Sequence, residues 1–181
     1  MPHRANGWRL KRTLKRKTEF RPLAEEDFRY LFVTYKDGGL ASLGKDFGEP
    51  VMEPAEFREA LGDEIIENYD GAWTLLAETK RGFMPVGVVL GFFSHRDPAK
   101  APFMIVGDML WFPWASDRNK VETAVGFFHA VRDEVPFVEY ANLETKKFFE
   151  TIAKHGVMRR VGTTHNVYPG EPTAIFETRR P

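Results

Sequence analysis

The sequence predicts an α/β fold of the α+β kind, in a single domain over residues 18–181. The chain of 181 residues is long enough for one hydrophobic core and slightly too short for two. Apolar residues recur at the helical period in four segments, and six or seven other segments follow the pattern of strands. Turn residues and changes of period separate these segments in the order β-α-α-β-β-β-α-β-α-β-β.

The first elements are a short strand and two helices. The strand runs through Phe20 and Leu23, and a helix begins near residues 24–27 with Phe28, Leu31 and Phe32 on its apolar face. Residues 36–50 are rich in Gly and end at a Pro, which predicts a loop. A second helix begins near Pro54, and its apolar side is Phe57, Leu61, Ile65 and Tyr69.

Three apolar runs then predict an antiparallel meander. They cover residues 72–78, 86–95 and 103–112, and the segments between them carry Gly or Pro together with charge. Strict alternation in the third run puts side chains on two faces of the sheet. One face has Ile105, Met109 and Trp111, and the other has Val106, Asp108, Leu110 and Phe112.

A helix follows the meander, and it begins at a capping residue, Ser116 or Asp117. Its buried side is predicted to be Val121, Ala124, Val125, Phe128 and Val131. Residues 137–143 predict a short strand and residues 144–156 a helix with Gly156 as its C-cap. The remaining residues, 157–180, read as a hairpin.

Composition excludes several classes of protein. The chain has no cysteine, so disulfides, thiolate metal sites and cysteine nucleophiles are excluded. No two of its five histidines have the i, i+4 spacing of paired ligands on a helix, and we predict no metal site. No apolar run approaches the roughly 20 residues of a membrane span, and no secretory signal is recognisable. We therefore expect no membrane contact and a cytoplasmic location, or a virion if the chain is encoded by a phage.

Residues 1–17 form a basic N-terminal arm that contains no acidic residue. Its cations are Arg4, Arg9, Lys11, Arg12, Lys15, Arg16 and Lys17. Two interpretations remain open. The arm is a solvated terminus, or it contacts nucleic acid or an acidic protein surface, where release of counterions drives binding.

The order of elements and the segment "YANLETKKFFETIAKHGV" together resemble the GNAT superfamily of acyl-CoA-dependent N-acyltransferases. Asn142 follows the fifth strand as in that family, and Gly156 and Val157 follow the last helix. The resemblance covers about residues 18–180 and implies a mixed sheet of about six or seven strands flanked by about four helices. Compact, degenerate members of this kind are similar to proteins encoded by bacteriophages.

The resemblance implies that acetyl-CoA binds at the fourth strand and at the start of the following helix, where unpaired N–H groups attract phosphate. The implied cofactor-binding residues are Met109, Leu110, Trp111, Arg118, Asn119, Lys120 and Asn142. Arg118 matches the family motif. Val121 and Thr123 stand where the family has Gly, and Gly or Ala, and their side chains are expected to take space that the diphosphate needs.

The resemblance also implies a general base on the fourth strand, and Asp108 has that position. A carboxylate on an otherwise apolar face is costly unless it is paired or used, so Asp108 otherwise pairs with an Arg or caps a bulge. The family's acid is a Tyr in the last helix. Counting from Asn142 reaches Phe149, and counting back from Gly156 reaches Ile152, so neither position offers a hydroxyl.

Three hypotheses follow for function. The first is an N-acyltransferase that moves an acetyl group from acetyl-CoA to an amine that the sequence does not identify. The second is a catalytically silent GNAT-like scaffold or interaction protein, and this hypothesis includes a protein encoded by a phage or associated with a virion. The third is a GNAT-like protein that its basic arm directs to nucleic acid.

Overall fold

The computed structural model describes residues 17–94 and 103–179. The predicted turn at 96–102 and the basic arm, apart from Lys17, lie outside these residues. The observed order of elements is the predicted one. The strands are β1 (Thr18–Pro22), β2 (Gly71–Thr79), β3 (Gly82–Phe93), β4 (Met104–Trp111), β5 (Phe137–Ala141), β6 (Met158–Thr164) and β7 (Thr173–Thr178). The helices are α1 (Phe28–Lys36), α2 (Pro54–Asn68), α3 (Asp117–Val131) and α4 (Leu143–Lys154), with 3₁₀ turns η1 (Glu25–Asp27), η2 (Ala41–Leu43) and η3 (Lys45–Phe47).

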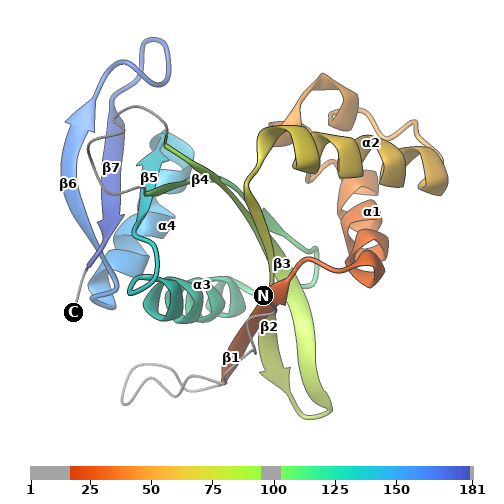
Figure 1. The fold of residues 1–181 in the computed structure, drawn as a ribbon, viewed down its shortest axis with the longest axis horizontal. Coiled ribbons are helices and arrows are strands. Elements are labelled where there is room, and N and C mark those ends of the chain that lie inside the picture. The colour runs from red at the N-terminus through yellow and green to blue at the C-terminus, as the bar shows by residue number, and fades with distance from the viewer. Residues whose placement is uncertain (1–16, 95–102, 180–181) are drawn as a thin grey trace.

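The strands form one mixed sheet in the order β1-β2-β3-β4-β5-β7-β6. All neighbours are antiparallel except β4 and β5, which are parallel and pair only at Met104 with Phe137 and at Ile105 with Val138. Beyond those two pairs the strands diverge, and Figure 1 shows the sheet opening there. This mixed seven-stranded sheet with four helices confirms the predicted fold class.

Each face of the sheet carries its own hydrophobic core. Leu31, Phe57 and Leu61 of α1 and α2 pack on one face against Val88, Leu90 and Leu110. The other face, with Val89, Val106 and Phe137, is covered by α3 and α4. Figure 1 shows the two pairs of helices on opposite sides of the sheet.

A β-bulge at Gly107 contradicts the strict alternation predicted for β4. Leu90 pairs with Asp108 and Gly91 with Val106, so Gly107 is the extra residue. Val106 therefore belongs to the core under α3 and α4, whereas Leu110 belongs to the core under α1 and α2. The extra residue puts Asp108 on the α1 and α2 side, opposite to the face of Val106.

Helices α3 and α4 begin at residues whose side chains cap them. Ser116 caps α3, where its hydroxyl accepts a hydrogen bond from the Asn119 N–H at 3.2 Å. Asn142 caps α4 in the same way, so the predicted strand 137–143 ends two residues earlier, at Ala141. Gly156 follows α4 with φ +80°, the left-handed conformation that favours glycine at a helix C-terminus.

Candidate functional site

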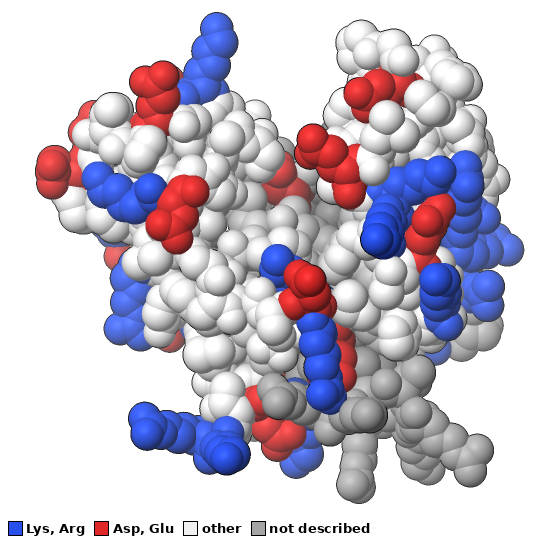
Figure 2. All heavy atoms as spheres, turned by 180° about the vertical axis from the view of Figure 1, so that it is seen from behind, with Lys and Arg blue, Asp and Glu red and all other residues white. Residues whose placement is uncertain are grey.

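The divergence of β4 from β5 leaves the edge of β4 open. The Phe112 N–H donates to the Val86 carbonyl of β3, so alternate residues of β4 direct their backbone groups towards β3. Leu110 is one of these. Met109 and Trp111 direct theirs towards the open edge, where they can bind an extended ligand. Figure 2 shows a hollow between the lobe of α1 and α2 and the lobe of β6 and β7, with acidic side chains in it.

Asp108 lies at this opening, held by residues from other elements. The Tyr69 hydroxyl, just after α2, donates a hydrogen bond of 2.8 Å to its Oδ2. Burial raises the pKa of the Asp108 carboxyl, and the hydrogen bonds from Tyr69 and Ser42 act in the opposite direction. Asp108 has neither an Arg partner nor a capping role among the described contacts, and its partners are the hydroxyl groups of Tyr69 and Ser42.

Glu139 is a second carboxyl at the same opening, on β5. Its side chain shares the inner face of β5 with Phe137 and Ala141, and the residue is only 8% exposed. Burial, and secondly the charge of Asp108, raises the pKa of Glu139 to about 8. Tyr168, between β6 and β7, is close enough that Glu139 and Asp108 both contribute to the raised pKa of its phenol, after burial.

Sequence reasoning did not select Tyr69 or Glu139 as functional residues. The sequence contained a signal for Glu139, since a carboxyl alternates with Phe137 and Ala141 on the inner face of a strand. The same reasoning had selected Asp108. No such signal exists for Tyr69, because its partner lies 39 residues away in the chain.

The start of α3 is the predicted phosphate-binding corner. Arg118, Asn119 and Lys120 lie within the first turn of the helix and not in a loop before it. Arg118 Nε donates to Glu122 Oε1 at 2.8 Å, and the Glu122 side chain is only 11% exposed. The Arg118 Nη groups have no hydrogen bond to another described residue, so they can still contact a phosphate.

The two residues that depart from the family motif differ in their placement. Thr123 is 1% exposed, and its hydroxyl donates to the Asn119 carbonyl at 2.7 Å. Its side chain therefore lies inside the protein, contrary to the expectation that it takes space in front of the helix. Val121 is partly exposed and packs against the core of α3 and α4.

Two other predicted cofactor-binding residues have structural contacts. Trp111 packs edge-on against Phe148 of α4, with ring centroids 5.7 Å apart. The Asn142 side-chain oxygen accepts hydrogen bonds from the N–H groups of Glu144 and Thr145, at 3.0 and 2.9 Å. Its amide nitrogen has no hydrogen bond to another described residue, and only that group is left for a ligand.

These residues fit a coenzyme A chain in two places. The open edge of β4 offers the backbone groups of Met109 and Trp111, and the first turn of α3 offers Arg118, Lys120 and the helix N-terminus. The negative charge of Glu122 repels phosphate groups at this corner. Its ion pair with Arg118 reduces that repulsion.

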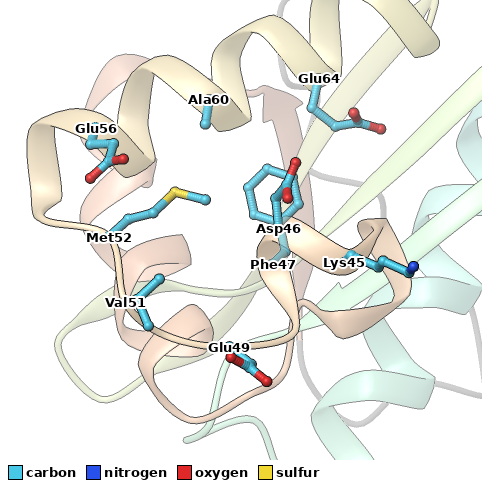
Figure 3. A pocket seen from close by; sticks show the side chains of 9 residues that line it. All are labelled: Lys45, Asp46, Phe47, Glu49, Val51, Met52, Glu56, Ala60 and Glu64. Carbon is cyan, nitrogen blue, oxygen red and sulfur yellow. The ribbon is translucent and has the colours of Figure 1, made fainter.

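A cavity of about 510 Å³ lies between η3 and α2. Figure 3 shows Met52, Phe47 and Ala60 lining it together with the carboxyl groups of Asp46, Glu49, Glu56 and Glu64. One of its carboxyl groups lies near Tyr69, the hydrogen-bond partner of Asp108. Glu64 is close enough to Tyr69 to contribute to the raised pKa of its phenol, after burial and Asp108.

Among residues 17–94 and 103–179, no three His, Asp or Glu side chains are grouped as metal ligands. In the same ranges, no helix combines the length and the apolar character that crossing a membrane requires.

Comparison with known proteins gives a structural likeness only. No family model and no curated protein matches the sequence. A GNAT-family acetyltransferase from Bacillus anthracis superposes with a TM-score of 0.60 at 13% identity, over 96% of each chain. A GCN5-related N-acetyltransferase from Brucella melitensis gives 0.60 at 18% identity, over 92% of this chain and 76% of that one.

A spermidine N-acetyltransferase from Vibrio cholerae, solved with CoA and spermine, gives a TM-score of 0.53 at 12% identity, over 88% of this chain and 94% of that one. Identities this low establish the architecture and leave the activity open. The chain has the GNAT-like fold, shared with solved structures that are mostly acetyltransferases.

Proposed function

We propose that this protein is an N-acyltransferase that moves an acetyl group from acetyl-CoA to an amine. The observation that carries the proposal is the opening between β4 and β5 beside a half-buried carboxyl, Asp108. A strand edge with free backbone donors and a carboxyl with a raised pKa are what acyl transfer to an amine requires.

Asp108 is the proposed general base. Burial raises its pKa towards the range in which a carboxylate can accept a proton from an amine. Tyr69 orients it, because the phenol donates a hydrogen bond to Oδ2. The amine must lose a proton to become nucleophilic, and Asp108 takes it.

The backbone N–H groups of Met109 and Trp111 are the proposed donors to the acyl carbonyl and its attached chain. Arg118 and Lys120 attract the phosphates, together with the N-terminus of α3. Asn119 belongs to the same turn, and the Asn142 amide nitrogen would be a further donor to the bound cofactor. When bound, acetyl-CoA supplies the acetyl group as an activated thioester.

The cavity beside α2 is the proposed binding site of the acceptor. We propose that this acceptor is an amine with additional positive charge. The four carboxyl groups of Asp46, Glu49, Glu56 and Glu64 outnumber Lys45, the single cation among the described residues of the lining, and give the cavity a negative field, while Met52 and Phe47 accommodate methylene groups. Spermidine has both features and is a suitable first acceptor to assay. An aromatic amine without a second charge, such as aniline, is its matched control.

Calorimetric titration with acetyl-CoA and with CoA tests the proposal. We expect micromolar binding, weakened about tenfold or more in Arg118→Ala, because a charge-assisted contact contributes roughly 1.5–3 kcal/mol. Arg118→Ala also leaves Glu122 unpaired, so the double variant Arg118→Ala/Glu122→Gln separates the lost contact from the exposed charge.

Arg159→Ala is the matched control, because Arg159 is also a surface arginine paired with a glutamate, Glu177. It lies on β6, away from the start of α3, and its loss should leave the affinity unchanged. The absence of binding at millimolar ligand would refute the enzyme hypothesis and favour the silent scaffold. Binding of DNA or RNA that falls steeply with salt, and is lost when residues 1–17 are removed, would favour the third hypothesis.

A further inference from the structure

Glu139 has no function in the mechanism proposed above, although it is the more buried of the two carboxyls at the opening. The residue is 8% exposed, and its side chain forms no hydrogen bond or ion pair with another described residue. An unpaired carboxylate in an apolar environment is costly, and the neutral acid is not. Glu139 is therefore held as a carboxylic acid, with a proton available to donate.

The groups around Glu139 come from four elements. Asp108 of β4 is the described titratable group that acts on it, and Glu139 in turn contributes to the raised pKa of Tyr168, between β6 and β7. Phe176 stands opposite it on β7. Phe149 of α4 packs against Phe176, with ring centroids 5.9 Å apart. The acid thus lies between the Asp108 site and the part of α4 where a hydroxyl group was expected.

Helix α4 cannot supply that hydroxyl. Phe149 and Ile152, at the two expected positions, are buried in the core at 3% and 0% exposure. The helix has two hydroxyl side chains, and both are engaged within it. Thr145 donates to Asn142 Oδ1 at 3.1 Å, and Thr151 donates to the Lys147 carbonyl at 2.9 Å.

We propose that the carboxylic acid of Glu139 donates the proton that the departing thiolate sulfur of coenzyme A requires. This inference rests on the proposed function. The amide C–N bond forms and the thioester C–S bond breaks. The proton that the amine loses goes to Asp108, and the sulfur takes its proton from Glu139. Water then returns a proton to Glu139 and removes one from Asp108, so the protein ends unchanged.

The pKa shifts of the two carboxyls agree with Glu139 as the acid and Asp108 as the base. A pKa of about 8 keeps Glu139 protonated near neutral pH, and it is close to the value of about 8.5 for an ordinary thiol. Transfer of the proton to sulfur is then nearly balanced in free energy. Burial raises the pKa of Asp108 as well, but Tyr69 and Ser42 donate to this carboxyl and oppose the rise, whereas Glu139 has no such donors among the described residues, so Asp108 is the better base and Glu139 the better acid.

Carbon-13 NMR of protein labelled at the glutamate carboxyl tests this assignment without turnover. We expect one carboxyl to titrate near pH 8. That signal should be absent from Glu139→Gln and from Glu139→Asp, which both remove the labelled glutamate, and retained in Glu177→Gln, a control on the neighbouring strand β7. Coenzyme A should raise its titration midpoint by about half a pH unit or more, because filling the opening excludes water from the acid. Adenosine 3′,5′-bisphosphate, which lacks the thiol arm, should leave it unchanged.

The outcomes separate the two proposals. Titration of Glu139 near pH 4 would overturn the proton-donor role. Binding of coenzyme A that leaves the Glu139 signal in place would also overturn it, while the proposed function would stand. A signal near pH 8 with no binding of coenzyme A by calorimetry would refute the proposed function, and the proton-donor role with it.

Discussion

The hydroxyl of Tyr69 donates a hydrogen bond of 2.8 Å to Asp108 Oδ2. This bond joins the end of α2 to the middle of β4, at the residue that follows the bulged Gly107. Without the bulge, Asp108 would face α3 and α4 and would be out of reach of Tyr69. The pKa of the phenol is raised by burial first and by Asp108 second, so Tyr69 remains a donor at every physiological pH.

Replacing Tyr69 with Phe removes this donor, so the pKa of Asp108 should rise further. The hydrogen bond favours the ionised form of Asp108 in the folded state. Its loss should therefore cost more stability at pH 8 than at pH 3, by about 1–2 kcal/mol, because rising pH favours the ionised form that the hydrogen bond stabilises. Urea denaturation of both proteins at the two pH values measures the difference. Equal losses at both would contradict the prediction and point to lost ring packing.

Glu139→Gln should make stability less dependent on pH. The pKa of Glu139 rises from an ordinary value of 4.5 in the unfolded chain to about 8 in the folded one. The folded state thus binds the proton more tightly than the unfolded state. The resulting contribution to the free energy of unfolding is complete below pH 4.5 and is lost as pH rises through about 8.

Between those pH values the wild-type protein should lose up to about 1.4 kcal/mol per pH unit relative to Glu139→Gln. Urea midpoints of both proteins at pH 5, 6.5 and 8 measure this. Parallel stability profiles would mean that Glu139 titrates normally.

Glu122→Gln should tighten the binding of CoA several-fold at low salt. Glu122 places a negative charge beside the phosphate corner, and Arg118 neutralises it through a single contact at 2.8 Å. The neutral amide can keep that contact without repelling the phosphates. The gain should shrink at 0.5 M salt, because the interaction is screened. Weaker binding would show that the Glu122 charge is needed to position Arg118.

The sequence was sufficient for the order of elements because local signals define them. Ser116 and Asn142 cap helices, and Gly156 ends one, in the places where their side chains or backbone freedom predict it. The bulge at Gly107 was not predictable in the same way. It depends on how β3 and β4 pair, and the alternation of β4 alone cannot reveal an extra residue.

The candidate site was only partly predictable, since it is assembled from distant segments. Asp108 and Arg118 were selected from local patterns and the family resemblance. Tyr69, the partner of Asp108, reaches it through a tertiary contact. Glu122, the partner of Arg118, reaches it through the i, i+4 geometry of the helix. Whether Asp108, Arg118 and the other selected residues act on a cofactor remains a prediction that the titrations above test.

Helix α3 lies so close to β1 that replacing a glycine of this helix with alanine should destabilise the protein, although alanine ordinarily stabilises a helix. A methyl group added at Gly126 would overlap Thr18, a residue 5% exposed at the start of β1, whereas one added at Gly62 of α2 meets nothing within 4 Å. Alanine is better than glycine inside a helix by about 0.8–1.0 kcal/mol. Gly62→Ala should therefore stabilise the protein by up to that amount.

Gly126→Ala should instead destabilise it by about 1–3 kcal/mol, because the overlap with Thr18 outweighs the gain in helix propensity. Urea denaturation followed by tryptophan fluorescence gives both changes under the same conditions. The double variant Gly126→Ala/Thr18→Ala adds a further check, since it removes the Thr18 hydroxyl, the atom nearest to the added carbon, and should recover part of the loss. If Gly126→Ala stabilised the protein as Gly62→Ala does, α3 would not pack on β1 at this distance.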